Sequence, residues 1–347
     1  MDRQYPKFII NLPYLSENVA EVKTRCREQG IEIAGIIKGI NAVPQVAKAY
    51  EEGGVEVLGT SRLEQIRLIK EYGVKTPMMY IRIPMLSEIE EMVELCEISL
   101  ASEIEVLKAV NEEAARQGKI HKIMLMQDVG DLREGFFIVD ELVEAARMIE
   151  FELDNLHLWG VGTNVGCYGA LEPTVETLSK VADAACEIEK AIGRELEIVC
   201  GGGSSSLMRV WDRNMPPKIN YLRAGGEIML AYTNQVVYGY DESFLHSDAF
   251  QLEAEIVEVK RKPDKEGNLR KRALIGLGTA DYCHLDGLHH RDPGVKLLSG
   301  FQDYTLVDIE EAQVDYKVGD ILRFDLSYSG MVYLAKSPGV KLEFIDK

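Results

Sequence analysis

Eight short apolar runs alternate with amphipathic stretches over the first two thirds of the chain, and this alternation constrains the fold more than any other feature. Apolar residues in the intervening stretches recur at helical spacing, as Val106, Val110 and Ala114 do. The runs are continuously apolar, which indicates strands buried on both faces of a parallel sheet. Eight such units predict a (β/α)8 barrel, and a long doubly wound sheet is the alternative. The runs are Glu32–Lys38, Val55–Thr60, Pro77–Ile83, Glu97–Ala101, Lys122–Asp128, Leu156–Asn164, Glu195–Gly201 and Ile219–Gly225.

The sequence pattern changes near residue 240. Apolar and polar residues now alternate in Gln251–Lys260, Lys271–Gly276, Tyr304–Ile309 and Ile321–Ser327, and turn signals such as Asp292-Pro293-Gly294 separate these segments. This pattern is typical of antiparallel strands. We therefore expect an α/β chain with a barrel over residues 1–238 and a mostly antiparallel β domain over residues 239–347.

Composition excludes several classes of function. A net charge of −18 argues against binding to nucleic acid or to anionic membranes. The N-terminus is polar and the apolar stretch after it is too short for a signal peptide, so we expect a cytoplasmic protein. The cysteines form no CxxC pair, which indicates reduced thiols rather than a disulfide frame or a zinc site. They are Cys26, Cys96, Cys167, Cys186, Cys200 and Cys283.

Lys38 ends the first apolar run, where the chain turns toward a helix. A lysine at the tip of a buried strand is costly to desolvate, and desolvation lowers the pKa of an amine. A lowered pKa is what an amine needs to form a Schiff base with an aldehyde. The alternative is an ordinary exposed loop lysine.

Two glycine-rich loops follow the seventh and eighth predicted strands. They are Gly201–Ser206 and Arg223–Gly226, and both expose backbone N–H groups with little side chain in the way. Loops at these two positions commonly bind phosphate in barrels. Together with a strand-tip lysine, they point to a phosphorylated aldehyde cofactor.

With these residues in place, the chain resembles the alanine racemase family of fold-type III pyridoxal-phosphate enzymes over nearly its whole length, and most of all the branch that contains ornithine racemases. The resemblance implies a pyridoxal 5'-phosphate cofactor, an amino-acid substrate, and a homodimer with shared active sites. The matching stretches are Ile37–Lys38, Arg82–Leu86, Asp128–Gly135, Asn164–Ala170, Gly201–Ser206, Leu222–Gly225 and Tyr316–Asp320.

The resemblance also implies roles for single residues. Lys38 would hold the cofactor and act as one of two bases, and Arg223 would face the pyridine nitrogen. A guanidinium group is always charged and only donates hydrogen bonds, so the ring nitrogen would stay unprotonated. Arg133 would bind the cofactor's phenolate oxygen or the substrate carboxylate, unless it pairs with Asp131 or Glu134. The positions implied to contact the cofactor are Lys38, Arg133, Asn164, Ser204, Arg223, Gly225, Gly226 and Tyr328, although Tyr328 could also be a core residue.

The chain departs from the family at the second base. Alanine racemases carry a tyrosine directly after a glycine in the active-site loop of the β domain, and Thr279 stands in that position here. Threonine cannot act as a base near neutral pH, so the role falls to Tyr282, Cys283 or Asp281, with Tyr282 first. Other departures are Ala42, Met126 and Asn164, which replace a tyrosine, a lysine and a histidine of the family.

The expected activity is racemisation of an amino acid, ornithine or alanine in the first place. Ornithine has a cationic tail, for which Asp281, Asp286 and Asp303 are candidate partners. The cluster around Cys283, His284 and Asp286 leaves open a metal-dependent D-amino-acid aldolase or dehydratase of the same fold, although no metal is expected. A non-catalytic pyridoxal-phosphate carrier and a cofactor-free barrel isomerase are further alternatives.

Overall fold

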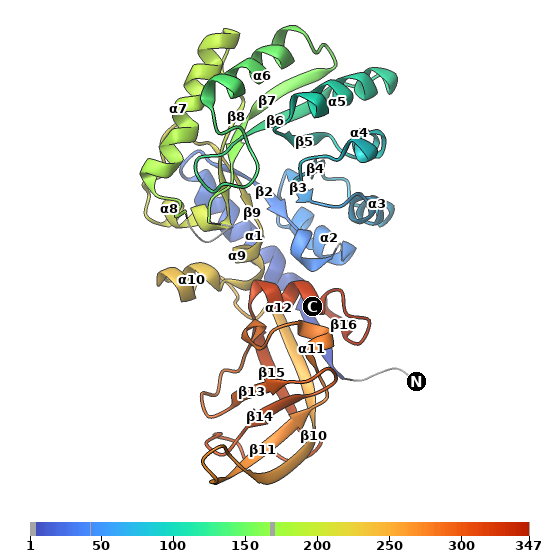
Figure 1. Ribbon diagram of the computed structural model, residues 1–347, viewed down its shortest axis with the longest axis vertical. Coiled ribbons are helices and arrows are strands. Elements are labelled where there is room, and N and C mark those ends of the chain that lie inside the picture. The colour runs from blue at the N-terminus through green and yellow to red at the C-terminus, as the bar shows by residue number, and fades with distance from the viewer. Residues whose placement is uncertain (1–4, 42, 167–170, 347) are drawn as a thin grey trace.

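A closed barrel of eight parallel strands forms the first domain, which confirms the predicted fold (Figure 1). The computed structural model describes residues 5–41, 43–166 and 171–346. β9 closes the ring by pairing with β2. Each strand lies within or overlaps one of the predicted apolar runs. The strands are β2 (Glu32–Ile36), β3 (Val57–Thr60), β4 (Met78–Tyr80), β5 (Ile98–Ala101), β6 (His121–Gln127), β7 (Leu156–Thr163), β8 (Ile198–Gly203) and β9 (Tyr221–Ala224).

Helices surround the barrel and bury the outer face of the ring. Met124, Met126, Trp159 and Tyr221 pack inside the ring, while the larger cluster lies between the strands and the helices. None of the helices that the structure describes is both long and apolar enough to cross a membrane. The helices are α1 (Leu12–Arg27), α2 (Pro44–Glu52), α3 (Leu63–Glu71), α4 (Ile89–Leu95), α5 (Ile104–Arg116), α6 (Val139–Phe151), α7 (Val175–Ile192), α8 (Leu207–Trp211), α9 (Gly226–Leu230) and α10 (Thr233–Tyr238).

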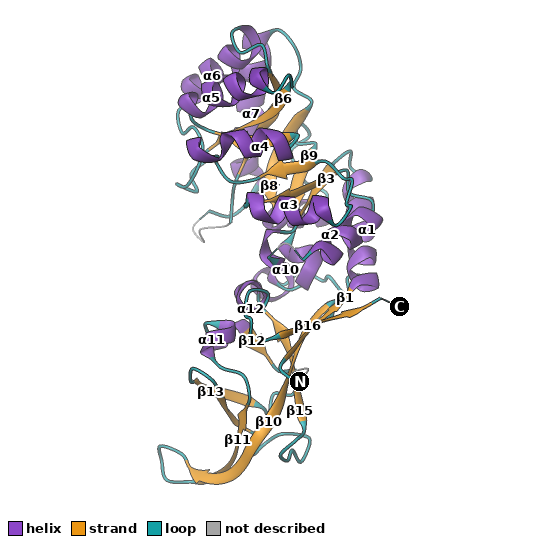
Figure 2. Cartoon of the chain, turned by 90° about the vertical axis from the view of Figure 1, so that its right-hand side faces the viewer, coloured by secondary structure: helices purple, strands orange, loops and turns teal. Residues whose placement is uncertain are grey.

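The second domain is a mostly antiparallel sheet, also as predicted (Figure 2). Its main strand order is β12-β15-β10-β11-β14-β13. Two short helices, α11 (Thr279–Tyr282) and α12 (Tyr328–Leu334), lie at the end of the sheet that faces the barrel. The strands are β10 (Phe250–Pro263), β11 (Leu269–Ile275), β12 (Leu288–His289), β13 (Lys296–Gly300), β14 (Thr305–Asp308) and β15 (Ile321–Leu326).

The N-terminal strand β1 (Lys7–Asn11) joins the sheet of the second domain and not the barrel. It pairs antiparallel with β10 and parallel with β16 (Lys341–Ile345). The chain thus begins in the second domain, enters the barrel through α1, and returns after α10. The domain boundary near residue 238 stays a prediction. Residues 7–11, which were expected in the barrel domain, belong to the sheet of the second domain.

Candidate active site

Lys38 lies at the carboxyl end of the barrel, two residues beyond the end of β2. It begins the 3-10 turn η1 (Lys38–Ile40), and its side chain is exposed. The expected strand-tip burial is therefore wrong for the single chain, because β2 ends at Ile36 and in the turn that follows only the side chain of Lys38 is exposed, between the buried residues Ile37 and Gly39. The position at the barrel mouth is as expected, and the exposed amine can meet a ligand there.

The two glycine-rich loops meet beside Lys38 around one hydroxyl group. Ser204 Oγ accepts hydrogen bonds from the N–H of Gly225, at 2.9 Å, and of Glu227, at 3.4 Å. A Cβ on Gly225 would lie 2.4 Å from the carbonyl oxygen of Ile36, so only glycine allows this close approach of β9 to β2. The loops form a small cradle of N–H groups and a hydroxyl, which suits a phosphate.

Tyr328 reaches this cradle from the second domain. A Cβ built on Gly39 would lie 3.0 Å from Tyr328 Cε2, and one built on Gly226 would lie 3.3 Å from Tyr328 Cδ2. The ring therefore lies between the turn that carries Lys38 and the loop that carries Gly226. Tyr328 is 36% exposed, which excludes the alternative that it is a core residue.

Arg223 points into the barrel from β9 and is 7% exposed. One terminal nitrogen, Nη2, donates to the carbonyl oxygen of Thr163 at 2.6 Å and to Asn164 Oδ1 at 2.7 Å. Its Nε is buried and has no hydrogen-bond partner among the described residues. A buried donor without an acceptor is costly, so this nitrogen is well placed to donate to a bound ligand.

Asn164 connects Arg223 to the loop after β6. Its Nδ2 donates to Glu134 Oε1, and the other carboxylate oxygen of Glu134 lies 2.5 Å from Arg133 Nε. Arg133 therefore pairs with Glu134 in the structure, which was the alternative to a role in ligand binding. The side chain of Arg133 nevertheless stays 40% exposed at the barrel mouth, and its guanidinium retains donors for a ligand.

Tyr282 does not lie where a base could reach a substrate. Its side chain is 1% exposed inside the second domain, and its hydroxyl lies 2.7 Å from Thr305 Oγ1. Burial raises the pKa of Tyr282, which further disfavours the phenolate. The expectation that Tyr282 is the second base is therefore not supported by its position, since the apolar packing of α11 turns the ring inward.

The two neighbours of Tyr282, Asp281 and Cys283, differ in whether their side chains are already engaged within the second domain. Asp281 Oδ1 accepts from Ser337 Oγ at 2.6 Å, and Oδ2 accepts from the N–H of Gly278 at 3.3 Å, so this carboxylate fixes its own loop. Cys283 is half-buried and has a φ of 69°, an unusual conformation for a residue other than glycine. The hydroxyl of Tyr333 hydrogen-bonds to Cys283, and this bond raises the pKa of Tyr333.

The remaining acidic and histidine candidates of the second domain lie at its surface. Asp303, His284 and Asp286 are exposed. Within the described ranges, no three histidine, cysteine or acidic side chains converge as a metal site would require. Ala42, Cys167 and the rest of the stretch 167–170 lie outside the described residues.

Sequence reasoning missed two features of the site. The sequence offers Glu134 only as a possible ion-pair partner of Arg133, although it also links Arg133 to Asn164. The sequence offers Asp131 only in the same way, although this residue is a buried carboxylate of the same loop. No local pattern in the sequence marks these features, because Asn164 follows a different strand and the burial of Asp131 depends on packing with distant segments.

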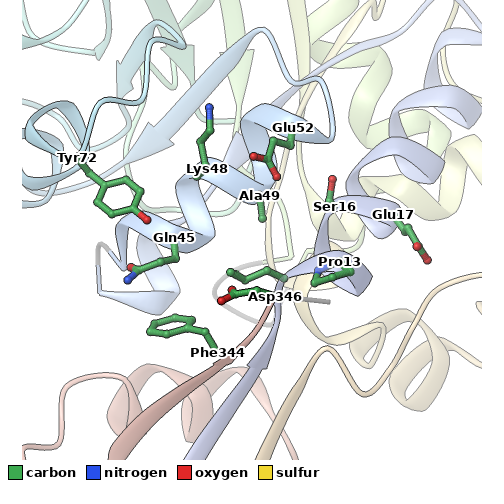
Figure 3. Close-up of a pocket in the computed structure, with 11 residues that line it drawn as sticks. Pro13, Ser16, Glu17, Gln45, Lys48, Ala49, Glu52, Tyr72, Phe344 and Asp346 are labelled. Atoms are coloured by element: carbon green, nitrogen blue, oxygen red, sulfur yellow. The ribbon is translucent and has the colours of Figure 1, made fainter.

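A cavity of about 660 Å³ opens elsewhere, on the flank of the barrel between α1, α2 and β16 (Figure 3). Lys48, Glu52, Tyr72, Phe344 and Asp346 are among the residues that line it. None of the predicted site residues does so. The candidate active site is therefore the barrel mouth, where Lys38, Ser204 and Arg223 lie, and not this cavity.

Comparison with known proteins agrees with this site. The family model "Alanine racemase, N-terminal domain" matches residues 10–232. An ornithine racemase of Acetoanaerobium sticklandii is 33% identical, with 99% of each chain covered. A lysine racemase of Thermotoga maritima is 34% identical, with 97% of this chain and 98% of the relative covered. The crystal structure of alanine racemase from Streptomyces lavendulae superposes with a TM-score of 0.78 at 20% identity, covering 100% of this chain and 98% of that one.

A barrel with a lysine at its mouth, joined to an antiparallel sheet domain, defines the class of protein. The chain belongs to the alanine racemase family. It is an amino-acid racemase, an isomerase, as its full-length relatives are.

Proposed function

We propose that the protein is a pyridoxal 5'-phosphate-dependent racemase of basic amino acids, with ornithine as its first substrate. The observation that carries this proposal is the convergence of Lys38, the Ser204–Gly225 cradle and Arg223 at one barrel mouth. The full-length similarity to an ornithine racemase and a lysine racemase supports the choice of substrate class.

The residues present fit the cofactor. The unpartnered Nε of Arg223 would donate to the pyridine nitrogen, an acceptor as long as that nitrogen carries no proton. Ser204, Gly225, Gly226 and Tyr328 would hold the phosphate, and Lys38 would hold the cofactor through its amine. When bound, pyridoxal phosphate supplies an aldehyde for the substrate's amino group and a ring that withdraws electrons from the α-carbon.

The chain's own residues then move and position protons. Lys38 removes or returns the α-proton on one face of the substrate. Arg223 remains charged and limits electron withdrawal by the ring, which favours return of the proton to the α-carbon over other reactions. Arg133 offers its exposed donors to the substrate carboxylate, and Glu134 holds its guanidinium in place.

A second base must act on the opposite face, because racemisation removes a proton on one side and delivers it on the other. We assign this base to the loop that follows α11 in a second copy of the chain, so that the active unit is a homodimer. Within α11 itself Tyr282 is enclosed and Asp281 is occupied, whereas Cys283, which directly follows the helix, is partly exposed. A thiolate forms more readily than a phenolate, so Cys283 replaces Tyr282 as the first candidate.

The proposal is tested with a panel of L-amino acids and chiral product analysis. Protein loaded with pyridoxal phosphate should convert L-ornithine, and to a lesser degree L-lysine, into the D-forms. Cleavage or deamination in place of racemisation would favour the aldolase or dehydratase alternative. Bound cofactor with no turnover of any amino acid would favour a carrier.

A further inference from the structure

The loop after β6, residues 128–135, contains a buried carboxylate that the account so far leaves without a role. Asp131 is 3% exposed, and neither of its carboxylate oxygens has a hydrogen-bond partner among the residues that the structure describes. Its neighbours Leu132 and Arg133 are exposed. Asp131, like the apolar Val129 of the same loop, is thus enclosed by protein rather than exposed to solvent.

The fold of the loop does not require this carboxylate. Asp128 makes the turn, because its Oδ1 accepts from the N–H of Gly130 at 2.8 Å and from that of Leu132 at 3.1 Å. Gly135 closes the base of the loop with a φ of 131°, where a Cβ would lie 2.5 Å from Asp128 N. Each of these contacts forms without Asp131.

An unpaired buried carboxylate destabilises a folded protein, since it loses its hydration and gains nothing in return. Residues that break this rule are concentrated at functional sites, where a ligand supplies the missing partner. The missing partner of a carboxylate is a cation or a hydrogen-bond donor. A cationic group of the substrate meets both requirements.

The loop is also connected to the candidate active site. It starts at the carboxyl end of a barrel strand, where substrates of barrel enzymes bind. Two and three residues after Asp131 come Arg133 and Glu134, and Glu134 is linked through Asn164 to Arg223. The carboxylate is therefore held in the same loop as the arginine assigned to the substrate's own carboxylate.

We propose that Asp131 binds the distal ammonium group of a diamino acid and thereby selects basic substrates. The inference rests on the proposed function, which it deepens by naming the residue that recognises the side chain. Arg133 and Asp131 of one loop would then bind the two ends of one substrate. The acidic residues of the second domain fit this role less well, because Asp281 is occupied and Asp286 and Asp303 are exposed.

The test compares L-ornithine with L-norvaline, which has the same carbon chain and no distal ammonium. Binding is measured by calorimetry and racemisation by chiral chromatography, for the wild type and for Asp131→Asn. The wild type should favour ornithine by about 100-fold or more, since a site with an unpaired buried charge rejects a ligand that leaves it unpaired. Asp131→Asn should lose most of that preference while norvaline is handled as before, and Asp131→Glu should restore part of it.

Two controls separate recognition from folding. Asp140→Asn, at an exposed acidic residue at the start of α6, should leave the preference unchanged. The melting temperature of Asp131→Asn should stay the same or rise, because an unpaired buried charge is removed. A lower melting temperature together with equal losses for both ligands would identify Asp131 as structural and overturn the proposal.

The outcomes also distinguish this proposal from the proposed function. Ornithine binding that depends on Asp131, without racemisation, would refute the racemase mechanism and retain the role of Asp131. Racemisation with an ornithine preference unchanged in Asp131→Asn would refute the role and retain the mechanism. Absence of ornithine binding in the loaded wild type would refute both.

Discussion

Arg223 and Asn164 form a buried pair in which Nη2 of the arginine donates to Oδ1 of the asparagine at 2.7 Å. The pair leaves Arg223 Nε without a partner among the residues that the structure describes, and it leaves Asn164 Nδ2 to hold Glu134. One amide group therefore fixes the direction of the guanidinium and couples it to the loop that carries Arg133. The predictions below follow from this arrangement and from the groups around it.

Replacing Arg223 is expected to change which reaction occurs. In Arg223→Glu a carboxylate would face the ring nitrogen and favour its protonation, which strengthens electron withdrawal. Racemisation should fall by about 100-fold or more, and a keto acid should appear as a side product. Chiral chromatography and a keto-acid assay measure the two effects. Arg213→Glu, at an exposed arginine paired with Glu28, is the matched control. An unchanged product mixture in Arg223→Glu would show that this residue does not face the ring.

Loss of Lys38 is expected to remove activity almost completely. Lys38→Ala eliminates both the amine that holds the cofactor and a base, so racemisation should drop by at least roughly 1,000-fold. Borohydride reduction should fix the cofactor to the wild-type chain and not to this variant, as mass spectrometry of the peptide would reveal. Lys48→Ala on α2, where the lysine pairs with Glu51, should behave like wild type. Near-normal turnover in Lys38→Ala would remove this residue from the mechanism.

The second base is identified by comparing Cys283→Ala with Tyr282→Phe. A two-base racemase that loses one base should stop racemising but should still exchange the α-proton of the enantiomer that Lys38 handles. Cys283→Ala should show this asymmetry in deuterium oxide. Tyr282→Phe should keep its activity and lose about 1 kcal/mol of stability with its bond to Thr305. The opposite result, with asymmetry in Tyr282→Phe alone, would return the role to the tyrosine.

The stability of the protein is expected to fall as pH rises, because of Glu227. This residue follows the phosphate cradle, is 1% exposed, and hydrogen-bonds to the equally buried Glu242. Burial, and then Glu242, raise the pKa of Glu227 to about 9 from an ordinary value of 4.5. The folded state therefore keeps a proton that the unfolded chain releases, so the free energy of unfolding decreases between pH 4.5 and about 9.

Glu227→Gln tests this assignment, because the amide needs no proton and can donate to Glu242. The variant should lose part of the decline in unfolding free energy between pH 6 and pH 9 that denaturant titrations measure in the wild type. Glu187→Gln, on the exposed face of α7, should retain the full decline. Parallel pH profiles for wild type and Glu227→Gln would show that Glu227 is not the titrating group.

The barrel could be predicted because its strands are continuous apolar runs. Such runs can be recognised in the sequence without knowing which strands pair with each other. β1 could not be predicted in this way, since its neighbours β10 and β16 lie more than two hundred residues away in the chain. The roles of Arg223, Ser204 and Tyr328 are implied by the resemblance to the alanine racemase family, whose matching stretches are short and local in the sequence. The inward turn of Tyr282 and the unpaired state of Asp131 depend on packing between distant segments, which no local pattern records.

The most direct test of the account is the incubation of the pyridoxal-phosphate-loaded protein with L-ornithine in deuterium oxide, followed by chiral chromatography and mass spectrometry. A two-base racemase should bring L- and D-ornithine to equal amounts, and both should carry deuterium at the α-carbon. L-Ornithine that stays optically pure, or that is consumed without D-ornithine appearing, would contradict the assignment of this chain as an ornithine-class racemase.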